Sequence, residues 1–221
     1  MKKIIIFGSG GHAKVILDCL LVSDEFEILG YTDYKKYNSD LSKKIKFLGK
    51  ISQLRKILKG ENLKYTKGIV AFGSNKNRKK IVSDVKKISK KFNWANVIHP
   101  SAVISNSVKM GVGNVVLSGT IICADTVLKN HVCINTGSSI DHDNLLNNFS
   151  STGPRVTTGG NVKIGELSSI GIGATVKQNI LIGKQTVIGA QSYVNKNCKS
   201  NFIYFGVPAK KIKKINYIKD L

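Results

Sequence analysis

The sequence has no apolar run that could cross a membrane, since no stretch of 18 apolar residues occurs among its 221 residues. At the N-terminus, Lys2 and Lys3 lead directly into a strand-like segment, and no cleavable apolar segment follows them. No C-x-x-C pair is present either. The four cysteines lie in apolar contexts typical of buried free thiols, and they are Cys19, Cys123, Cys133 and Cys198. We therefore expect a cytoplasmic protein with reduced, structural cysteines and without membrane insertion.

Acidic residues are scarce, because 13 Asp and Glu face 35 Lys and Arg and give a formal net charge of +22. Such an excess can indicate a nucleic-acid partner. However, the only arginines are Arg55, Arg78 and Arg155, and the lysines are spread along the chain. Proteins that read bases and phosphates favour the bidentate fork of arginine. We expect no nucleic-acid partner and interpret the charge as attraction for phosphorylated small molecules.

The second half of the chain lacks the 3.6-residue period of a helix. Instead, every sixth residue from Ile98 to Val194 is aliphatic at 15 of 17 positions, and only Thr152 and Thr158 break this register. The residue after each aliphatic is often Gly, Asn or Asp, which tolerate tight corners. A β-sandwich would alternate over whole strands between turns spaced roughly 8 to 12 residues apart. The fixed period of six predicts a β-helix, in which stacked coils bury one continuous core.

The first half reads as strand, glycine turn and helix. An apolar strand over residues 3–7 runs into a G-x-G-x-x-A motif and a helical stretch, and a second strand ends at Asp33. Such glycines let a backbone approach a phosphate at a helix N-terminus. With only about 95 residues before the repeat, half of a doubly wound fold fits, which favours a mononucleotide over a redox dinucleotide. We expect an α/β Rossmann-like half-domain over residues 1–96 and the β-helix over residues 97–221, with a basic C-terminal tail.

Five phrases together carry a family resemblance, and they are Gly8-Ser9-Gly10-Gly11-His12, Ile98-His99-Pro100-Ser101-Ala102, Asn135-Thr136, Ile140-Asp141-His142-Asp143 and Gly206-Val207-Pro208-Ala209-Lys210. The chain resembles bacterial hexapeptide-repeat sugar acyltransferases, most closely nucleotide-sugar N-acetyltransferases of the bacillosamine-pathway type, which group with sialic acid O-acetyltransferase-like proteins. The resemblance implies a left-handed parallel β-helix and a homotrimer with active sites between subunits. It also implies acetyl-CoA as co-substrate, no metal, and a nucleotide-linked amino-dideoxy sugar as acceptor, for surface glycan biosynthesis.

His142 is the candidate general base. Its imidazole titrates near neutrality, and a neighbouring carboxylate can fix its tautomer and stabilise the cation, a role that Asp143 takes in the family. Asp141 is the less favoured partner. In the family the base acts directly on the sugar amine without an acyl-enzyme, so no nucleophilic Cys or Ser is required. A lone histidine is otherwise a satisfied structural group, which is our interpretation of His131 and His99.

The same matching implies further contacts. The nucleotide-sugar candidates are Gly10, Gly11 and His12 for the diphosphate or sugar, Asp33 for the base, Gly73 for the nucleotide and Asn135 for the acceptor sugar. Asn135 has a plain corner residue as its alternative. Arg78, with Lys79 and Lys80, either contacts phosphate or lies on a solvated helix face. The acetyl-CoA candidates are Ser151, Gly160, Ile172, Gly173, Ala190 and Lys210, the last with a solvated tail as its alternative.

The chain departs from the family pattern at Ser151, where close relatives place a second histidine that contacts the acyl donor. The segment from Thr152 to Arg155 is expected to form a modified coil or loop near the thioester. Two other functions stay open, O-acetylation of a sugar hydroxyl and a non-catalytic nucleotide-sugar-binding scaffold. A zinc enzyme of the β-helix class would need three convergent histidines, whereas past His99 the repeat has only His131 and His142.

Overall fold

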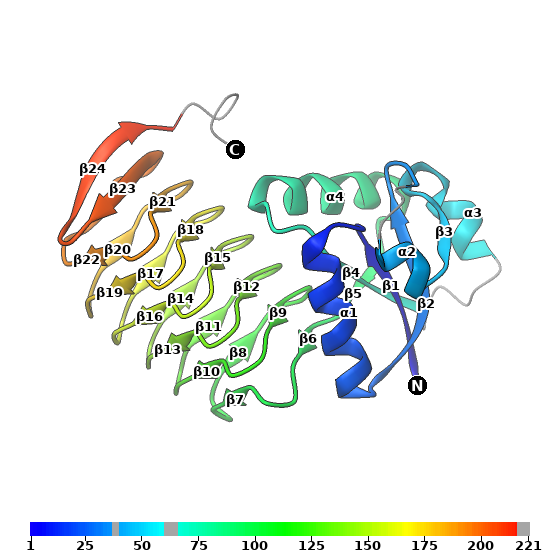
Figure 1. Cartoon of the computed structure of the whole chain (residues 1–221), viewed down its shortest axis with the longest axis horizontal. Helices are drawn as coiled ribbons and strands as arrows, with labels where there is room; N and C mark the ends of the chain where they lie inside the picture. The colour runs from blue at the N-terminus through cyan, green and yellow to red at the C-terminus, as the bar shows by residue number, and fades with distance from the viewer. Residues whose placement is uncertain (37–39, 60–65, 216–221) are drawn as a thin grey trace. The chain divides into compact units, whose positions relative to one another are not determined.

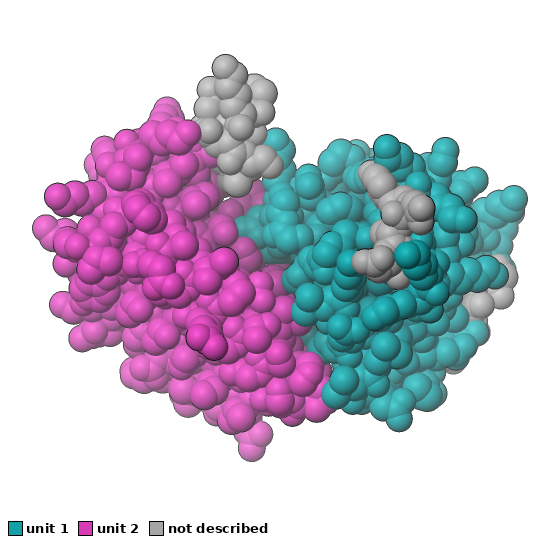
Figure 2. Space-filling model, viewed as in Figure 1, with its two compact units in different colours: residues 1–97 teal, residues 98–221 magenta. Residues whose placement is uncertain are grey.

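The computed structural model describes residues 1–36, 40–59 and 66–215. The chain forms two compact units, Met1–Val97 and Ile98–Leu221, which are coloured separately in Figure 2. The sequence predicts this boundary one residue earlier, between residues 96 and 97.

Unit 1 is built on a parallel five-stranded sheet with the order β3-β2-β1-β4-β5 (Figure 1). The strands are β1 (Lys2–Phe7), β2 (Phe26–Asp33), β3 (Phe47–Lys50), β4 (Thr66–Val70) and β5 (Asn93–Trp94). The helices are α1 (Gly11–Ser23), α2 (Asp40–Lys44), the 3-10 helix η1 (Ile51–Gln53), α3 (Leu54–Lys59) and α4 (Asn75–Ile88). The chain moves outward from β1 to β3 and then returns to place β4 on the other side of β1. Open α/β sheets bind ligands beyond the strand carboxyl ends at such a switch point.

Strand β1 is buried on both faces. The side chains of Ile4, Ile5, Ile6 and Phe7 have no exposed surface, and Ile5 and Phe7 join an apolar cluster with residues of α3 and α4. A parallel sheet covered on both faces needs a continuous apolar run rather than alternation. The run of isoleucines at the N-terminus therefore specifies the central strand.

Unit 2 is a left-handed parallel β-helix, which confirms the expected fold. Short strands of two residues each run from β6 to β22, and each strand up to β19 pairs with the third strand after it, as Ile122 of β10 does with Ile140 of β13. These strands form three sheets, which are the three faces of the β-helix, and the coils are seen stacked in Figure 1. The strands are β6 (Val97–Ile98), β7 (Val103–Ile104), β8 (Lys109–Met110), β9 (Val115–Val116), β10 (Ile121–Ile122), β11 (Val127–Leu128), β12 (Cys133–Ile134), β13 (Ser139–Ile140), β14 (Leu145–Leu146), β15 (Ser151–Thr152), β16 (Thr157–Thr158), β17 (Lys163–Ile164), β18 (Ser169–Ile170), β19 (Thr175–Val176), β20 (Leu181–Ile182), β21 (Val187–Ile188) and β22 (Tyr193–Val194).

The second residue of each short strand is the residue of the six-residue register. From Val116 onward these side chains are buried, and the aliphatic ones form a single core cluster along the unit. The segment after Ser151 keeps the regular coil, since β15 and β16 pair in register with β18 and β19. The prediction of a modified coil or loop over Thr152 to Arg155 is therefore wrong. An antiparallel hairpin of β23 (Phe202–Gly206) and β24 (Ala209–Lys214) closes the unit.

Candidate active site

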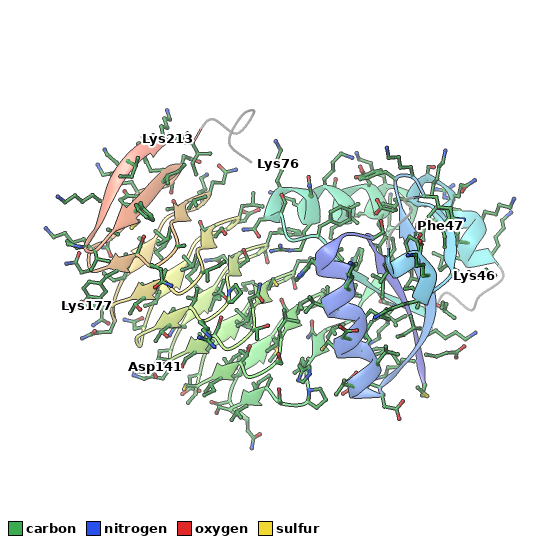
Figure 3. The ribbon with its side chains drawn as sticks, in the orientation of Figure 1. Lys46, Phe47, Lys76, Asp141, Lys177 and Lys213 are labelled. Atoms are coloured by element: carbon green, nitrogen blue, oxygen red, sulfur yellow. The ribbon has the colours of Figure 1, made fainter. Side chains whose placement is uncertain are left out.

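His142 and Asp143 occupy a corner of the β-helix between β13 and β14. The corner requires a left-handed residue, and Asp143 adopts it with φ 57°, a conformation that Asp tolerates better than most residues. The Nδ1 atom of His142 lies 2.7 Å from Oδ2 of Asp143, and each side chain is 58% exposed. Figure 3 labels the preceding residue, Asp141, on the same corner. The pair is therefore formed, with one ring nitrogen engaged by the carboxylate.

The carboxylates of this corner change the titration of the imidazole. The hydrogen bond with Asp143 raises the pKa of His142 above its usual value, and the charge of Asp141 raises this pKa further. The expected partner Asp143 thus has the larger effect. Because both carboxylates favour the cation, the site stabilises the protonated imidazole that a general base becomes.

Side chains of two coils donate hydrogen bonds to the backbone of the His142 corner. Asn144 is 1% exposed, and its Nδ2 donates to the carbonyls of Asp141 at 2.7 Å, His142 at 3.1 Å and Gly159 at 3.0 Å. From the preceding coil, the Thr126 hydroxyl donates to the Asp141 carbonyl at 2.8 Å. Neither Asn144 nor Thr126 belongs to a motif that predicts a functional role from the sequence. A signal was present for Asn144, because its register position otherwise holds mostly small or β-branched residues.

Gly160 lies directly against the imidazole from the next coil. A Cβ atom at this position would stand 2.5 Å from both Cε1 and Nε2 of His142. The structure therefore brings Gly160, an acetyl-CoA candidate, together with the candidate base, and only a glycine leaves the ring in its present place.

Two other acetyl-CoA candidates lie on another edge of the β-helix. His142 and Gly160 follow β13 and β16, which are neighbours in the six-stranded sheet of unit 2. Ile172 and Ala190 instead follow β18 and β21, which are neighbours in the eight-stranded sheet. Asn135 follows β12 of that same eight-stranded sheet. Because the strands of one sheet all lead into the same edge, Asn135 shares its edge with Ile172 and Ala190 and not with His142.

The remaining acetyl-CoA candidates are Gly173, Ser151 and Lys210. Gly173 adopts φ +65°, and its backbone N–H donates to the Pro154 carbonyl at 2.9 Å. Ser151 begins strand β15 and is buried. Lys210 is exposed on β24, where it pairs with Phe205.

In unit 1, the glycine loop joins β1 to α1. Gly10 caps the helix, Gly11 begins it, and both are exposed with open space where a Cβ would stand. His12 follows in the first turn. Burial, together with the positive charge of Arg78, lowers the pKa of His12 to about 4. His12 is therefore neutral at pH 7 and would meet a phosphate as a hydrogen-bond donor rather than as a cation.

Asp33 is buried at the end of β2. It is 4% exposed, and its two carboxylate oxygens accept hydrogen bonds from Ser9 Oγ at 2.7 Å and from the Tyr34 backbone at 2.7 Å. The carboxylate thus ties the glycine loop to the end of β2. A cavity of about 270 Å³ begins at the next residue, and it is lined by Tyr34, Ile51, Ser52, Asp84, Lys87 and Ile88.

Arg78 is not on a solvated helix face. It is 2% exposed, and its Nη1 donates to the carbonyls of Phe72 at 3.2 Å and Gly73 at 3.0 Å, while Nη2 donates to Asn75 Oδ1 at 2.7 Å. The guanidinium therefore organises the loop between β4 and α4, which leaves Gly73 exposed at the strand carboxyl end. Lys79 and Lys80 are exposed, and Lys80 pairs with Asp84 at 2.8 Å.

Neither a metal cluster nor a membrane span is found in the described part of the chain. No group of three His, Cys, Asp or Glu there is arranged to hold a metal ion. No described helix combines the length and apolarity needed to cross a bilayer. Burial raises the pKa of Cys19 to about 11 and that of Cys198 to about 12, so these thiols are poor nucleophiles near neutral pH.

A hexapeptide β-helix with a His–Asp corner, next in sequence to an α/β unit with a phosphate-type glycine loop, defines a two-unit acyltransferase architecture. Residues 3–85 match the family of the PglD N-terminal domain. Over 97% of its length, the chain is similar to a histidine-to-asparagine mutant of perosamine N-acetyltransferase from Caulobacter crescentus, in complex with CoA and GDP-perosamine. The identity is 31%, 98% of that chain is covered, and the TM-score is 0.89. The chain belongs to the family of nucleotide-sugar N-acetyltransferases.

Two further solved structures share this architecture. The acetyltransferase domain of PglB from Neisseria gonorrhoeae, in complex with acetyl coenzyme A, is 29% identical with a TM-score of 0.86, over 96% of this chain and 99% of that one. WeeI from Acinetobacter baumannii is 20% identical with a TM-score of 0.76, over 96% of this chain and 100% of that one, which shows the fold alone.

Proposed function

We propose that the protein transfers the acetyl group of acetyl-CoA to the amino group of a nucleotide-linked amino-dideoxy sugar, with His142 as the general base. The observation that carries the proposal is the 2.7 Å contact between His142 Nδ1 and Asp143. This contact leaves Nε2 as the nitrogen available to an acceptor. CoA and GDP-perosamine bound to the Caulobacter relative, and acetyl-CoA bound to the Neisseria domain, support the substrate classes.

In the proposed reaction, the sugar nitrogen attacks the thioester carbon, and a C–N bond replaces the C–S bond. Nε2 of His142 takes the amine proton, and the sulfur leaves as the CoA thiolate and then becomes protonated. Asp143 stabilises the imidazolium that forms. Since no acyl-enzyme is required, the high thiol pKa values of Cys19 and Cys198 are compatible with this direct transfer.

We assign nucleotide binding to unit 1. The exposed backbone of Gly10 and Gly11 at the start of α1 suits a diphosphate, with His12 as a neutral donor. The cavity beyond Tyr34 is the candidate site for the base, which leaves Asp33 to hold the loop rather than to touch the base. Gly73 lies on the second loop at the carboxyl edge of the sheet, and Arg78 shapes this loop.

We also propose a homotrimer with active sites between subunits. The candidate base lies on one edge of the β-helix, while Asn135, Ile172 and Ala190 lie on another, so a second copy that brings these edges together would complete the site. Acetyl-CoA would contact Gly160 on the edge of His142, and also Ser151, Ile172, Gly173, Ala190 and Lys210. We place the reaction in the cytoplasm, as a step in the synthesis of a surface glycan.

The test is a thiol-release assay with acetyl-CoA and a panel of UDP-, GDP- and dTDP-linked 4-amino and 3-amino sugars, with free sialic acid included. His142→Ala is expected to lower turnover by roughly 10²- to 10⁴-fold. The coil below carries Ala124 at the equivalent position, so this substitution is compatible with the fold. Turnover only on sialic acid would indicate O-acetylation. No turnover on any acceptor would favour a binding scaffold.

A further inference from the structure

The two breaks in the six-residue register share one local arrangement, in which a buried threonine hydroxyl accepts a hydrogen bond from a backbone N–H. Thr152 and Thr158 replace aliphatic residues in the interior of the β-helix, and each is 2% exposed. Thr158 stands between Ile140 on the preceding coil and Val176 on the following one. Valine would fill either position with the same shape and without a buried hydroxyl.

Elsewhere in the coils, a regular backbone ladder joins each corner to the next coil. The residue after an inward side chain donates its N–H to the carbonyl of the inward residue on the next coil, as Leu117 does to Ile134 at 3.0 Å and Lys129 to Leu146 at 2.9 Å. At the breaks, a side chain accepts instead. The N–H of Asn135 donates to Thr152 Oγ1 at 3.1 Å, and that of Asp141 donates to Thr158 Oγ1 at 3.3 Å.

The two corners then continue in the same way. Asn135 Oδ1 accepts from the N–H of Thr136 at 2.9 Å, and Asp141 Oδ1 accepts from the N–H of His142 at 2.8 Å. Both corners carry residues of the proposed acetyl transfer, because one presents Asn135 and the other His142. In an assembly that joins their two edges, both breaks would border one site.

A buried hydroxyl in an aliphatic column stabilises a coil less than valine does, since it replaces apolar surface and must be hydrogen-bonded. Departures of this kind from a regular sequence pattern commonly occur at functional sites. We propose that Thr152 and Thr158 are positioning residues, whose hydroxyls replace the ladder carbonyls and thereby set the corners of Asn135 and His142. This proposal rests on the acetyl transfer proposed above.

The test replaces Thr158 with valine and measures thermal stability and steady-state kinetics, using the acceptor of the panel that turns over fastest. Thr158→Val is expected to keep or raise the melting temperature while kcat falls about 10- to 100-fold, the effect of a misplaced catalytic group. The KM for acetyl-CoA should stay unchanged. Thr158→Ser retains the hydroxyl and should restore kcat. Thr152→Val should instead raise the KM for the acceptor, because the Thr152 hydroxyl accepts the hydrogen bond from the backbone N–H of Asn135, the candidate acceptor contact.

Thr186→Val is the matched control. Thr186 is also fully buried, and its hydroxyl donates to the Lys199 carbonyl at 3.0 Å, away from both corners. This variant should lose stability and keep its kcat. The role of Thr158 is overturned if Thr158→Val keeps the wild-type kcat, or if it loses activity and stability together and Thr158→Ser does not restore them. The role of Thr152 is overturned if Thr152→Val leaves the KM for the acceptor unchanged. If His142→Ala keeps the wild-type rate, the proposed reaction itself fails.

Discussion

Gly160 offers the sharpest test of where the imidazole must stand. In Gly160→Ala, the new Cβ would lie 2.5 Å from Cε1 and Nε2 of His142, and an ordinary carbon contact needs about 3.5 Å. The ring must therefore move by about 1 Å. Gly160 does not have a positive φ, so alanine adds no backbone strain there. A displacement of this size at a reacting group lowers the rate by about 10²-fold.

The assay is thiol release under saturating acetyl-CoA and acceptor, so that kcat is read directly. Gly160 is also a candidate acetyl-CoA contact, and a double-mutant cycle separates the two effects. If the methyl group acts through the imidazole, Gly160→Ala should lower kcat in the wild-type background and change little in the His142→Ala background. An equal loss in both backgrounds, or a wild-type rate in Gly160→Ala, would refute the steric argument.

Three further predictions concern titration and packing. The acidic limb of the kcat–pH profile should have its midpoint above the usual pKa of histidine. Asp143→Asn should shift this midpoint to lower pH, because it removes the largest cause of the raised pKa of His142. Asp125→Asn, one coil below, should leave the midpoint unchanged. The pKa of His12 is depressed to about 4 in the folded state, so between pH 6.5 and 4 only the unfolded chain binds a proton at this residue. The free energy of unfolding should therefore fall by about 3 kcal/mol as the pH is lowered through that window. His12→Gln should remove this part of the fall. Ile164→Ala, at a side chain with no exposed surface, should lower the free energy of unfolding by about 3 kcal/mol in denaturant titrations.

The sequence predicts the β-helix well because every coil repeats the same physical demand. One aliphatic side chain per hexad must enter the core, and a corner must follow it. The strand and glycine turn at the N-terminus are equally local, since they depend on the apolar run of Ile4, Ile5 and Ile6 and on adjacent glycines. Both the β-helix and the N-terminal strand with its glycine turn can therefore be predicted from neighbouring residues alone.

Arg78 and Asp33 show where local interpretation ends. Asp33 ends strand β2, and Arg78 lies in the first turn of α4 after the loop that follows β4, so a ligand contact is a reasonable expectation for both charged residues. Their side chains instead satisfy protein groups, the carbonyls of Phe72 and Gly73 in one case and the Ser9 hydroxyl in the other. These partners come within reach only when the loops fold, so the sequence does not distinguish a ligand contact from a loop clamp.

Exceptions to the repeat carry information that the motifs do not. Every inward position of a β-helix has nearly the same surroundings, so a polar side chain there has no local reason to exist. Thr152 and Thr158 are such exceptions, whereas Asn144 belongs to a different column, in which Ser and Thr are common and Asn114 is a second asparagine. Thr158 and Asn144 both hydrogen-bond to the backbone of Asp141, the residue before His142, and Asn144 also donates to the His142 carbonyl. A break in the aliphatic column, such as Thr158, therefore indicates a candidate positioning group that no short motif contains.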